Sequence, residues 1–213
     1  MGILDLFKSK KINISIGIVE NNNSKLVFDI KSDALTQVFN AYSFYGEEKH
    51  IFNNKIIENY SSSDNPNDVL AVAISYLGEG YTFRKQAIDY FERYLKCPSN
   101  QKYFSNWFIY SSLATLYEQE YMFQEALACL QILIKLDNNS NYADYTRIGN
   151  VLTKIDINKA VIFYENLQRE SFYKNYKDVF DKAYKEALLK QKKGYKFKPR
   201  KNKKELESVW VLA

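Results

Sequence analysis

The sequence Tyr110-Ser-Ser-Leu-Ala-Thr-Leu-Tyr117 decides the fold, because a similar octet, Tyr145-Thr-Arg-Ile-Gly-Asn-Val-Leu152, follows it farther along the chain. Each octet begins with tyrosine and carries an aliphatic residue three positions later. A small residue, Ala114 or Gly149, comes directly after that aliphatic residue. Apolar residues at this spacing share one face of a helix. Each octet therefore predicts one amphipathic helix.

Two further segments predict the partner helices. Ala126 is followed four residues later by Leu130, and Ala160 is followed four residues later by Tyr164. The two alanines are 34 residues apart. A segment that recurs at a fixed period of roughly 20–50 residues is typical of helical repeat proteins. The sequence therefore predicts two successive helix pairs.

A less regular copy precedes these two pairs. Ala87 and Phe91 repeat the pattern of the second helix, 39 residues before Ala126. Pro98 falls where that helix is expected to end, since proline cannot continue a helix. The apolar residues between positions 70 and 77 predict its first helix.

The composition also favours helices. The 213 residues include only 7 glycines and 3 prolines, too few for a protein made of many tight turns. Hydrophobic residues make up 46% and charged residues 26% of the chain, which is typical of a globular protein. Between residues 69 and 189 the apolar positions recur with the helical period. A mainly α-helical protein is expected, and a generic helical bundle is the alternative to an ordered repeat.

These segments resemble the tetratricopeptide repeat (TPR) family over residues 67–189. The family pattern has an aromatic residue, then Leu-Gly and Tyr at three-residue steps, and later an Ala followed by Phe four positions on. The resemblance implies a TPR-like α-solenoid of antiparallel helix pairs. The amphipathic stretch 173–189 is expected to be the capping helix that covers its last open face.

The resemblance also implies a binding site. TPR proteins bind an extended peptide or a helix in the concave groove lined by their first helices. Transfer of the groove-facing positions to this sequence gives Tyr76, Ser111, Thr115, Glu118, Gln119, Thr146, Asn150 and Lys154. Arg147 alone matches a position of the family's carboxylate-binding variant, so the class of partner stays open.

A small N-terminal module is expected before the repeats. Alternating apolar residues over 12–18 and 26–30 flank an Asn-rich turn, a pattern typical of a β-hairpin. Ser32 and Asp33 are candidate N-caps of a following helix. The stretch 61–68 predicts a linker, because it is rich in Ser, Asn and Asp and contains Pro66. The predicted division is 1–66 for this module, 67–189 for the repeats and 190–213 for a basic tail.

The tail carries most of the excess positive charge. Residues 190–204 contain nine Lys or Arg and no Asp or Glu, whereas the whole chain has a net charge of +5. Aromatic residues between cations are suited to stack on bases while the cations contact phosphates. The candidate nucleic-acid residues are Lys192, Lys193, Tyr195, Lys196, Phe197, Lys198, Arg200 and Lys201. A solvated end that aids solubility is the other interpretation.

Signals for catalysis, cofactors and metals are absent from the sequence. It contains no Gly-rich phosphate loop, no nucleophile elbow and no His-Glu-x-x-His pattern. The single histidine, His50, has no Cys or Glu at ligand spacing. Cys97 and Cys129 form no CxxC pair and are expected to be buried apolar side chains of a protein in a reducing compartment. No enzyme activity, cofactor or metal is expected.

The sequence thus predicts a cytoplasmic, non-catalytic adaptor or regulator that binds a protein or peptide in the TPR-like groove. A nucleic-acid-associated protein that uses the tail is the first alternative. A self-associating structural subunit is the second. No stretch has the roughly 18 apolar residues needed to span a membrane.

Overall fold

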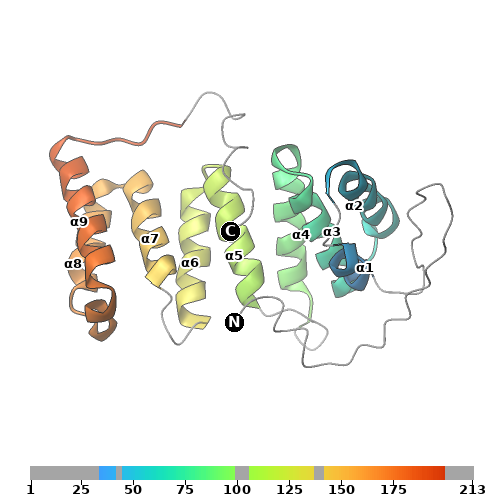
Figure 1. Ribbon diagram of the computed structural model, residues 1–213, viewed down its shortest axis with the longest axis horizontal. Helices are drawn as coiled ribbons and strands as arrows, with labels where there is room; N and C mark the ends of the chain where they lie inside the picture. The colour runs from blue at the N-terminus through green and yellow to red at the C-terminus, as the bar shows by residue number, and fades with distance from the viewer. Residues whose placement is uncertain (1–33, 42–44, 99–105, 137–141, 200–213) are drawn as a thin grey trace.

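The computed structural model of the protein describes residues 34–41, 45–98, 106–136 and 142–199 (Figure 1). Every regular element in these ranges is a helix. The α-helices are α1 (Ala34–Asn40), α2 (Gly46–Tyr60), α3 (Pro66–Gly78), α4 (Arg84–Lys96), α5 (Asn106–Gln119), α6 (Phe123–Leu136), α7 (Tyr142–Ile155), α8 (Ile157–Leu167) and α9 (Lys177–Lys192). Two short 3-10 helices are η3 (Tyr81–Phe83) and η5 (Ser171–Tyr176). The hairpin expected over residues 12–30 lies outside the described residues.

The helices pack in consecutive pairs. α3 packs against α4, α5 against α6 and α7 against α8, and each pair lies beside the next through α4 with α5 and α6 with α7. Figure 1 shows these helices side by side in a row. Helices joined by such short turns run antiparallel. The mainly helical, paired arrangement predicted from the sequence is thereby confirmed.

The small residues lie where the sequence places the helix contacts. Ala87, Ala126 and Ala160 are all fully buried. Gly149 of α7 lies so close to α8 that a Cβ atom there would be 2.0 Å from the Oη of Tyr164. The Tyr164 ring therefore occupies the space that a side chain at position 149 would need.

One apolar core runs through the first eight α-helices. It begins with Leu35 of α1 and Ile56 of α2 and continues to Ala160 of α8. α1 and α2 both pack against α3, so the core is continuous across residue 66. The division of the chain into a module and repeats at this residue stays a prediction. Only a helix after residues 32–33 was expected in this region, and α2 was not predicted. Its sequence has few regularly spaced apolar residues. Of these, Phe52 and Ile56 are buried.

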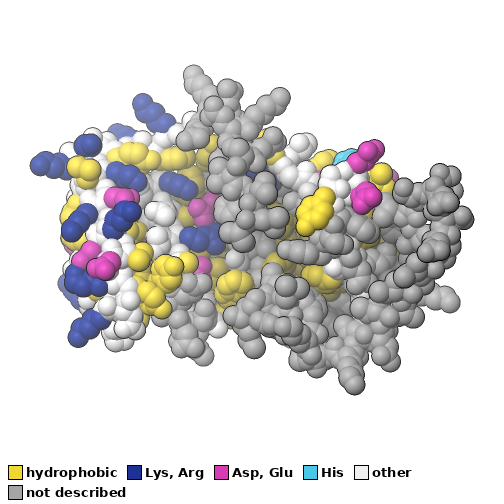
Figure 2. Space-filling view, in the orientation of Figure 1, with side chains coloured by type: hydrophobic (Ala, Val, Ile, Leu, Met, Phe, Trp, Pro, Cys, Tyr) yellow, Lys and Arg dark blue, Asp and Glu magenta, His cyan; other side chains and the backbone are white. Residues whose placement is uncertain are grey.

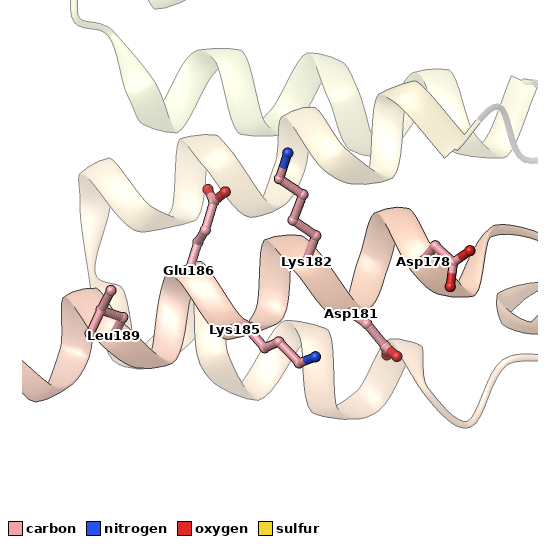
Figure 3. A pocket seen from close by; sticks show the side chains of 6 residues that line it. All are labelled: Asp178, Asp181, Lys182, Lys185, Glu186 and Leu189. Atoms are coloured by element: carbon pink, nitrogen blue, oxygen red, sulfur yellow. The ribbon is translucent and has the colours of Figure 1, made fainter.

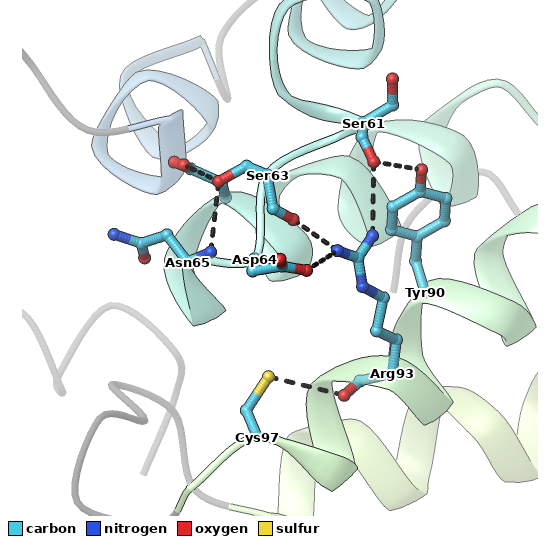
Figure 4. Close-up of polar contacts among 8 residues, drawn as sticks. Ser61, Ser63, Asp64, Asn65, Tyr90, Arg93 and Cys97 are labelled. Atoms are coloured by element: carbon cyan, nitrogen blue, oxygen red, sulfur yellow. Dashed lines mark hydrogen bonds and ion pairs between the residues drawn. The ribbon is translucent and has the colours of Figure 1, made fainter.

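The predicted linker is held by side chains of α4 (Figure 4). Because α2 ends at Tyr60 and α3 begins at Pro66, the connection comprises only residues 61–65. Tyr90 donates a hydrogen bond to the Ser61 carbonyl oxygen (2.9 Å), and Arg93 Nη2 donates to that of Ser63 (2.6 Å). Arg93 also pairs with Asp64 at 2.5 Å. These contacts tie the connection to the second helix of the following pair.

The C-terminal cap is an aromatic cluster rather than one helix. α9 packs on α8, as expected of a capping helix, and η5 folds beneath it. Phe180 of α9 is fully buried and stacks with Tyr173 of η5 at 5.5 Å between ring centroids. Tyr145 of α7 contacts Phe172 of η5 at 4.7 Å. Rings from three elements therefore close the end of the row.

Replacement of Gly149 by alanine is expected to destabilise the protein. Alanine in a helix is ordinarily more stable than glycine by about 1 kcal/mol, but here its methyl group would overlap the buried Tyr164 ring. Overpacking of this kind costs about 1–3 kcal/mol. Urea denaturation of G149A should therefore show a lower free energy of unfolding than the parent chain.

The double variant G149A/Y164L is the control for this contact. It installs the residues that stand at the matching positions of the preceding pair, Ala114 and Leu130, both of which are buried there. We expect the alanine to cost less in the Y164L background than in the parent chain. An equal cost in both backgrounds, or a stabilising G149A, would contradict the proposed overlap.

The two cysteines should differ in reactivity. Cys129 of α6 is buried, and burial raises the pKa of its thiol to about 11. About 0.1% of such a thiol is the reactive thiolate at pH 8. Cys97 follows α4 and is only half-buried, which the sequence interpretation missed. A thiol assay with DTNB at pH 8 should titrate one fast thiol in the folded chain and two in denaturant. Two equally fast thiols in the folded chain would contradict this.

Candidate protein-interaction groove

Four of the predicted groove residues form one polar cluster between α5 and α7. Arg147 Nη2 donates to Glu118 Oε1 (3.0 Å) and to Thr115 Oγ1 (3.1 Å), and its Nε donates to the same Glu118 oxygen (3.3 Å). Lys154 Nζ donates to Glu118 Oε2 at 3.4 Å. We call Thr115, Glu118, Arg147 and Lys154 the polar cluster. Residues 29 to 36 positions apart in the sequence thus meet across the first helices of two successive pairs.

The polar cluster remains accessible to solvent and has an excess of positive charge. The side chains of Glu118, Arg147 and Lys154 are 21%, 27% and 29% exposed. One carboxylate faces two cations, which leaves a formal charge of +1 in the cluster. Guanidinium and ammonium groups have several N–H donors each. The arrangement is therefore suited to bind carbonyl or carboxylate oxygens of a ligand.

In the described part of the chain, the side chains of the other predicted groove residues of α5 and α7 make no hydrogen bond to the polar cluster. The carbonyl oxygen of Ser111 accepts a hydrogen bond from Thr115 Oγ1 (3.0 Å). Thr146 Oγ1 donates to the Tyr142 carbonyl oxygen of its own helix (3.0 Å). Gln119 is half-buried, and Asn150 is exposed.

Tyr76 belongs to a separate group of rings in the α3–α4 pair. Its centroid lies 5.8 Å from that of Phe83 and 5.6 Å from that of Tyr90. Burial raises the pKa of its hydroxyl, with a smaller contribution from Tyr90. The structure therefore places Tyr76 in the packing of the first repeat pair, apart from the polar cluster.

The α5 helix is also tied to the preceding pair. The hydroxyl of Tyr117 donates a hydrogen bond to Glu92 of α4. Burial, followed by this hydrogen bond, raises the pKa of Tyr117. Tyr117 thus ties α5 to α4, the helix before it in the chain. This contact restricts rotation of α5, which carries Thr115 and Glu118 of the polar cluster.

The tail residues divide into exposed cations and engaged rings. Lys192, Lys193, Lys196 and Lys198 are exposed, whereas Arg200 and Lys201 lie outside the described residues. Lys190 Nζ lies 5.5 Å from the Tyr195 ring centroid. The Phe197 ring contacts Phe123 and Tyr121 at 5.0 and 5.9 Å between centroids. The two rings expected to stack on bases therefore have partners within the chain.

Tyr121 and Phe123 were not predicted as site residues. Tyr121 lies in the turn between α5 and α6, Phe123 is the first residue of α6, and both are half-buried. Aromatic residues in and directly after a turn, where polar residues and glycine are usual, were the signal that could have identified them. Lys154 Nζ lies 5.1 Å from the Phe123 ring centroid, so these rings adjoin the polar cluster.

A depression on α9 has no organisation comparable to that of the polar cluster (Figure 3). Its volume is about 400 Å³, and all its lining residues come from this one helix: Asp178, Asp181, Lys182, Lys185, Glu186 and Leu189. Figure 2 shows many Lys and Arg side chains at the α7–α9 end in this view, with acidic side chains among them. The depression is an ordinary charged helix face of mixed sign.

The described ranges contain no group of three or more His, Cys, Asp and Glu that could hold a metal ion. His50 of α2 pairs with Glu79, which also accepts a hydrogen bond from Asn53 (2.7 Å). These contacts join α2 to the end of α3. None of the helices in the part of the chain that the structure describes is long and apolar enough to cross a membrane.

Comparison with known proteins gives one weak structural match. No family model matches the chain, and no curated protein matches it. Among solved structures, the crystal structure of MamA protein matches with a TM-score of 0.43 and 18% sequence identity. The alignment covers 85% of this chain and 99% of that chain. At this level the match assigns neither a family nor a function.

Proposed function

We propose that the protein is a non-catalytic adaptor or regulator that binds an extended peptide or a helix of another protein across α5 and α7. The observation that carries this proposal is the polar cluster. Three of its residues are expected groove-facing positions, and Arg147 matches a position of the family's carboxylate-binding variant. Residues from both helices lie within hydrogen-bond distance of one another. A ligand that crosses α5 and α7 would meet a preformed set of donors.

The chemistry of the cluster indicates which part of a partner it would contact. Because Glu118 already accepts from both cations, the remaining donors of Arg147 and Lys154 are available to acceptors of the partner. Backbone carbonyls and acidic side chains are such acceptors. Asn150, exposed on the same helix, adds an amide that can both donate and accept.

The nucleic-acid alternative depends on the lysines of the tail. Phe197 and Tyr195 are engaged within the chain, so stacking on bases would require their release. Electrostatic contact through the exposed lysines would remain and would weaken steeply with salt. A cytoplasmic location remains a prediction from the sequence.

A substitution at Asn150 tests the groove. N150R places a long cationic side chain on α7 without removing a hydrogen bond of the polar cluster. We expect the tagged full-length chain to co-purify a discrete protein from its native cells at moderate salt, with and without nuclease. N150R should reduce that capture roughly tenfold, as substitutions at central contacts do.

The matched control is N166R, the same change at an exposed position of α8. It should capture the partner as well as the parent chain. Equal capture by N150R and N166R would overturn the groove assignment. Recovery of nucleic acid alone would favour the tail instead. That nucleic acid should be lost after nuclease treatment, and also in a variant with glutamine in place of Lys196, Lys198, Arg200 and Lys201.

A further inference from the structure

The segment after α9 returns along the row of helices instead of extending away from it. Figure 1 shows it leaving the end of α9 and crossing above α7 toward the α5–α6 pair. The ring of Phe197 reaches Tyr121 and Phe123, at the turn between α5 and α6. The Phe123 and Phe197 ring planes are nearly perpendicular, at 88°, which is a favourable edge-to-face geometry. We call residues 194–199 the strap.

The backbone at Tyr121 is unusual in a way that bears on this contact. Tyr121 has a φ of 63° and is the single non-glycine residue with positive φ in the described part of the chain. Met122 N donates to the Tyr117 carbonyl oxygen (2.8 Å) and Tyr121 N to that of Glu118 (3.3 Å). This pair of bonds is the Schellman motif that ends many helices, and its left-handed position is usually glycine.

The end of α9 shows the same motif with the usual residue. Tyr195 N donates to the Lys190 carbonyl oxygen (3.0 Å) and Gly194 N to that of Gln191 (2.9 Å). Gly194 has a φ of 63°, the same value as Tyr121. A side chain with a Cβ atom costs free energy in this conformation. The tyrosine after the end of α5 therefore lowers backbone stability. Its ring is one of the two that Phe197 contacts.

We propose that Tyr121 and Phe123 form a docking site for an aromatic side chain, and that Phe197 of the strap is its occupant. Three observations support the proposal independently: the two ring contacts, the left-handed tyrosine and the glycine-terminated turn that directs the strap back. Residual backbone strain that persists in a protein is concentrated at functional positions. The proposal does not depend on a partner in the groove.

Docking also links the strap to the polar cluster. Lys154 Nζ lies over the Phe123 ring and donates to Glu118. Lys154, Lys196 and Phe197 line a common cavity of about 440 Å³ between the α7–α8 turn and the strap. The docked strap thus borders the proposed binding face. In the sequence, the strap directly precedes the last cations of the tail.

Trypsin cleavage of the Lys196–Phe197 bond in the full-length chain tests the proposal. The variant Y121G removes the ring, retains a residue suited to the left-handed backbone and leaves the sequence of the strap unchanged. Because cleavage requires release of the strap, we expect Y121G to be cleaved at this bond roughly tenfold faster than the parent chain. Y121F keeps the ring and should be cleaved at the parental rate.

Two measurements distinguish docking from a general loss of stability. The thermal midpoint of Y121G should stay close to that of the parent, because relief of the left-handed backbone conformation offsets the loss of the ring contacts. In the otherwise unchanged chain, 4-fluorophenylalanine at position 197 should give a ¹⁹F resonance displaced from its position in denaturant. Parental cleavage of Y121G, or a resonance at the denatured position, would overturn the proposal.

Discussion

The close approach of the two helices within each pair is the constraint on which the other features depend. Alanine is buried in the second helix of all three repeat pairs, and in the last pair Gly149 leaves room for the ring of Tyr164. If the helices of a pair separated, the faces of successive first helices would shift relative to one another. Glu118 and Arg147, which meet across two pairs at 3.0 Å, would then no longer be aligned. Tight apolar packing thereby positions the polar cluster.

Much of the repeat region could be predicted from the sequence, because close packing leaves a periodic record. The spacing of Ala126 and Ala160 predicted the pairs. The TPR resemblance gave Thr115, Glu118 and Lys154 as groove-facing residues and Arg147 as a match to the carboxylate-binding variant. Tyr76 shows where register fails, since its copy is irregular and the ring packs with Phe83 and Tyr90. The contacts of Phe197 could not be predicted, because they join a segment outside the repeat to a turn. Periodicity carries no information about such contacts.

The structure changes how the two candidate binding regions relate. In the sequence, the groove residues and the basic tail are separate and support competing hypotheses. In the structure, the Phe123 ring contacts both Phe197 and Lys154. A negatively charged ligand that draws Lys154 away from this ring would alter the environment of the strap as well. The polar cluster and the beginning of the tail are therefore parts of one surface.

The strap has a consequence for how the protein unfolds. In a solenoid each unit contacts only its neighbours, so the terminal units can open while the middle stays folded. Phe197 instead connects the chain beyond α9 to the α5–α6 turn, and so passes over the α7–α8 pair. If α9 unfolds alone, the contacts of Phe197 with the α5–α6 pair, which is not adjacent to α9, must also break. Such a contact between distant positions raises contact order and couples the end of the array to its middle. The C-terminal half is therefore expected to unfold as a single cooperative unit.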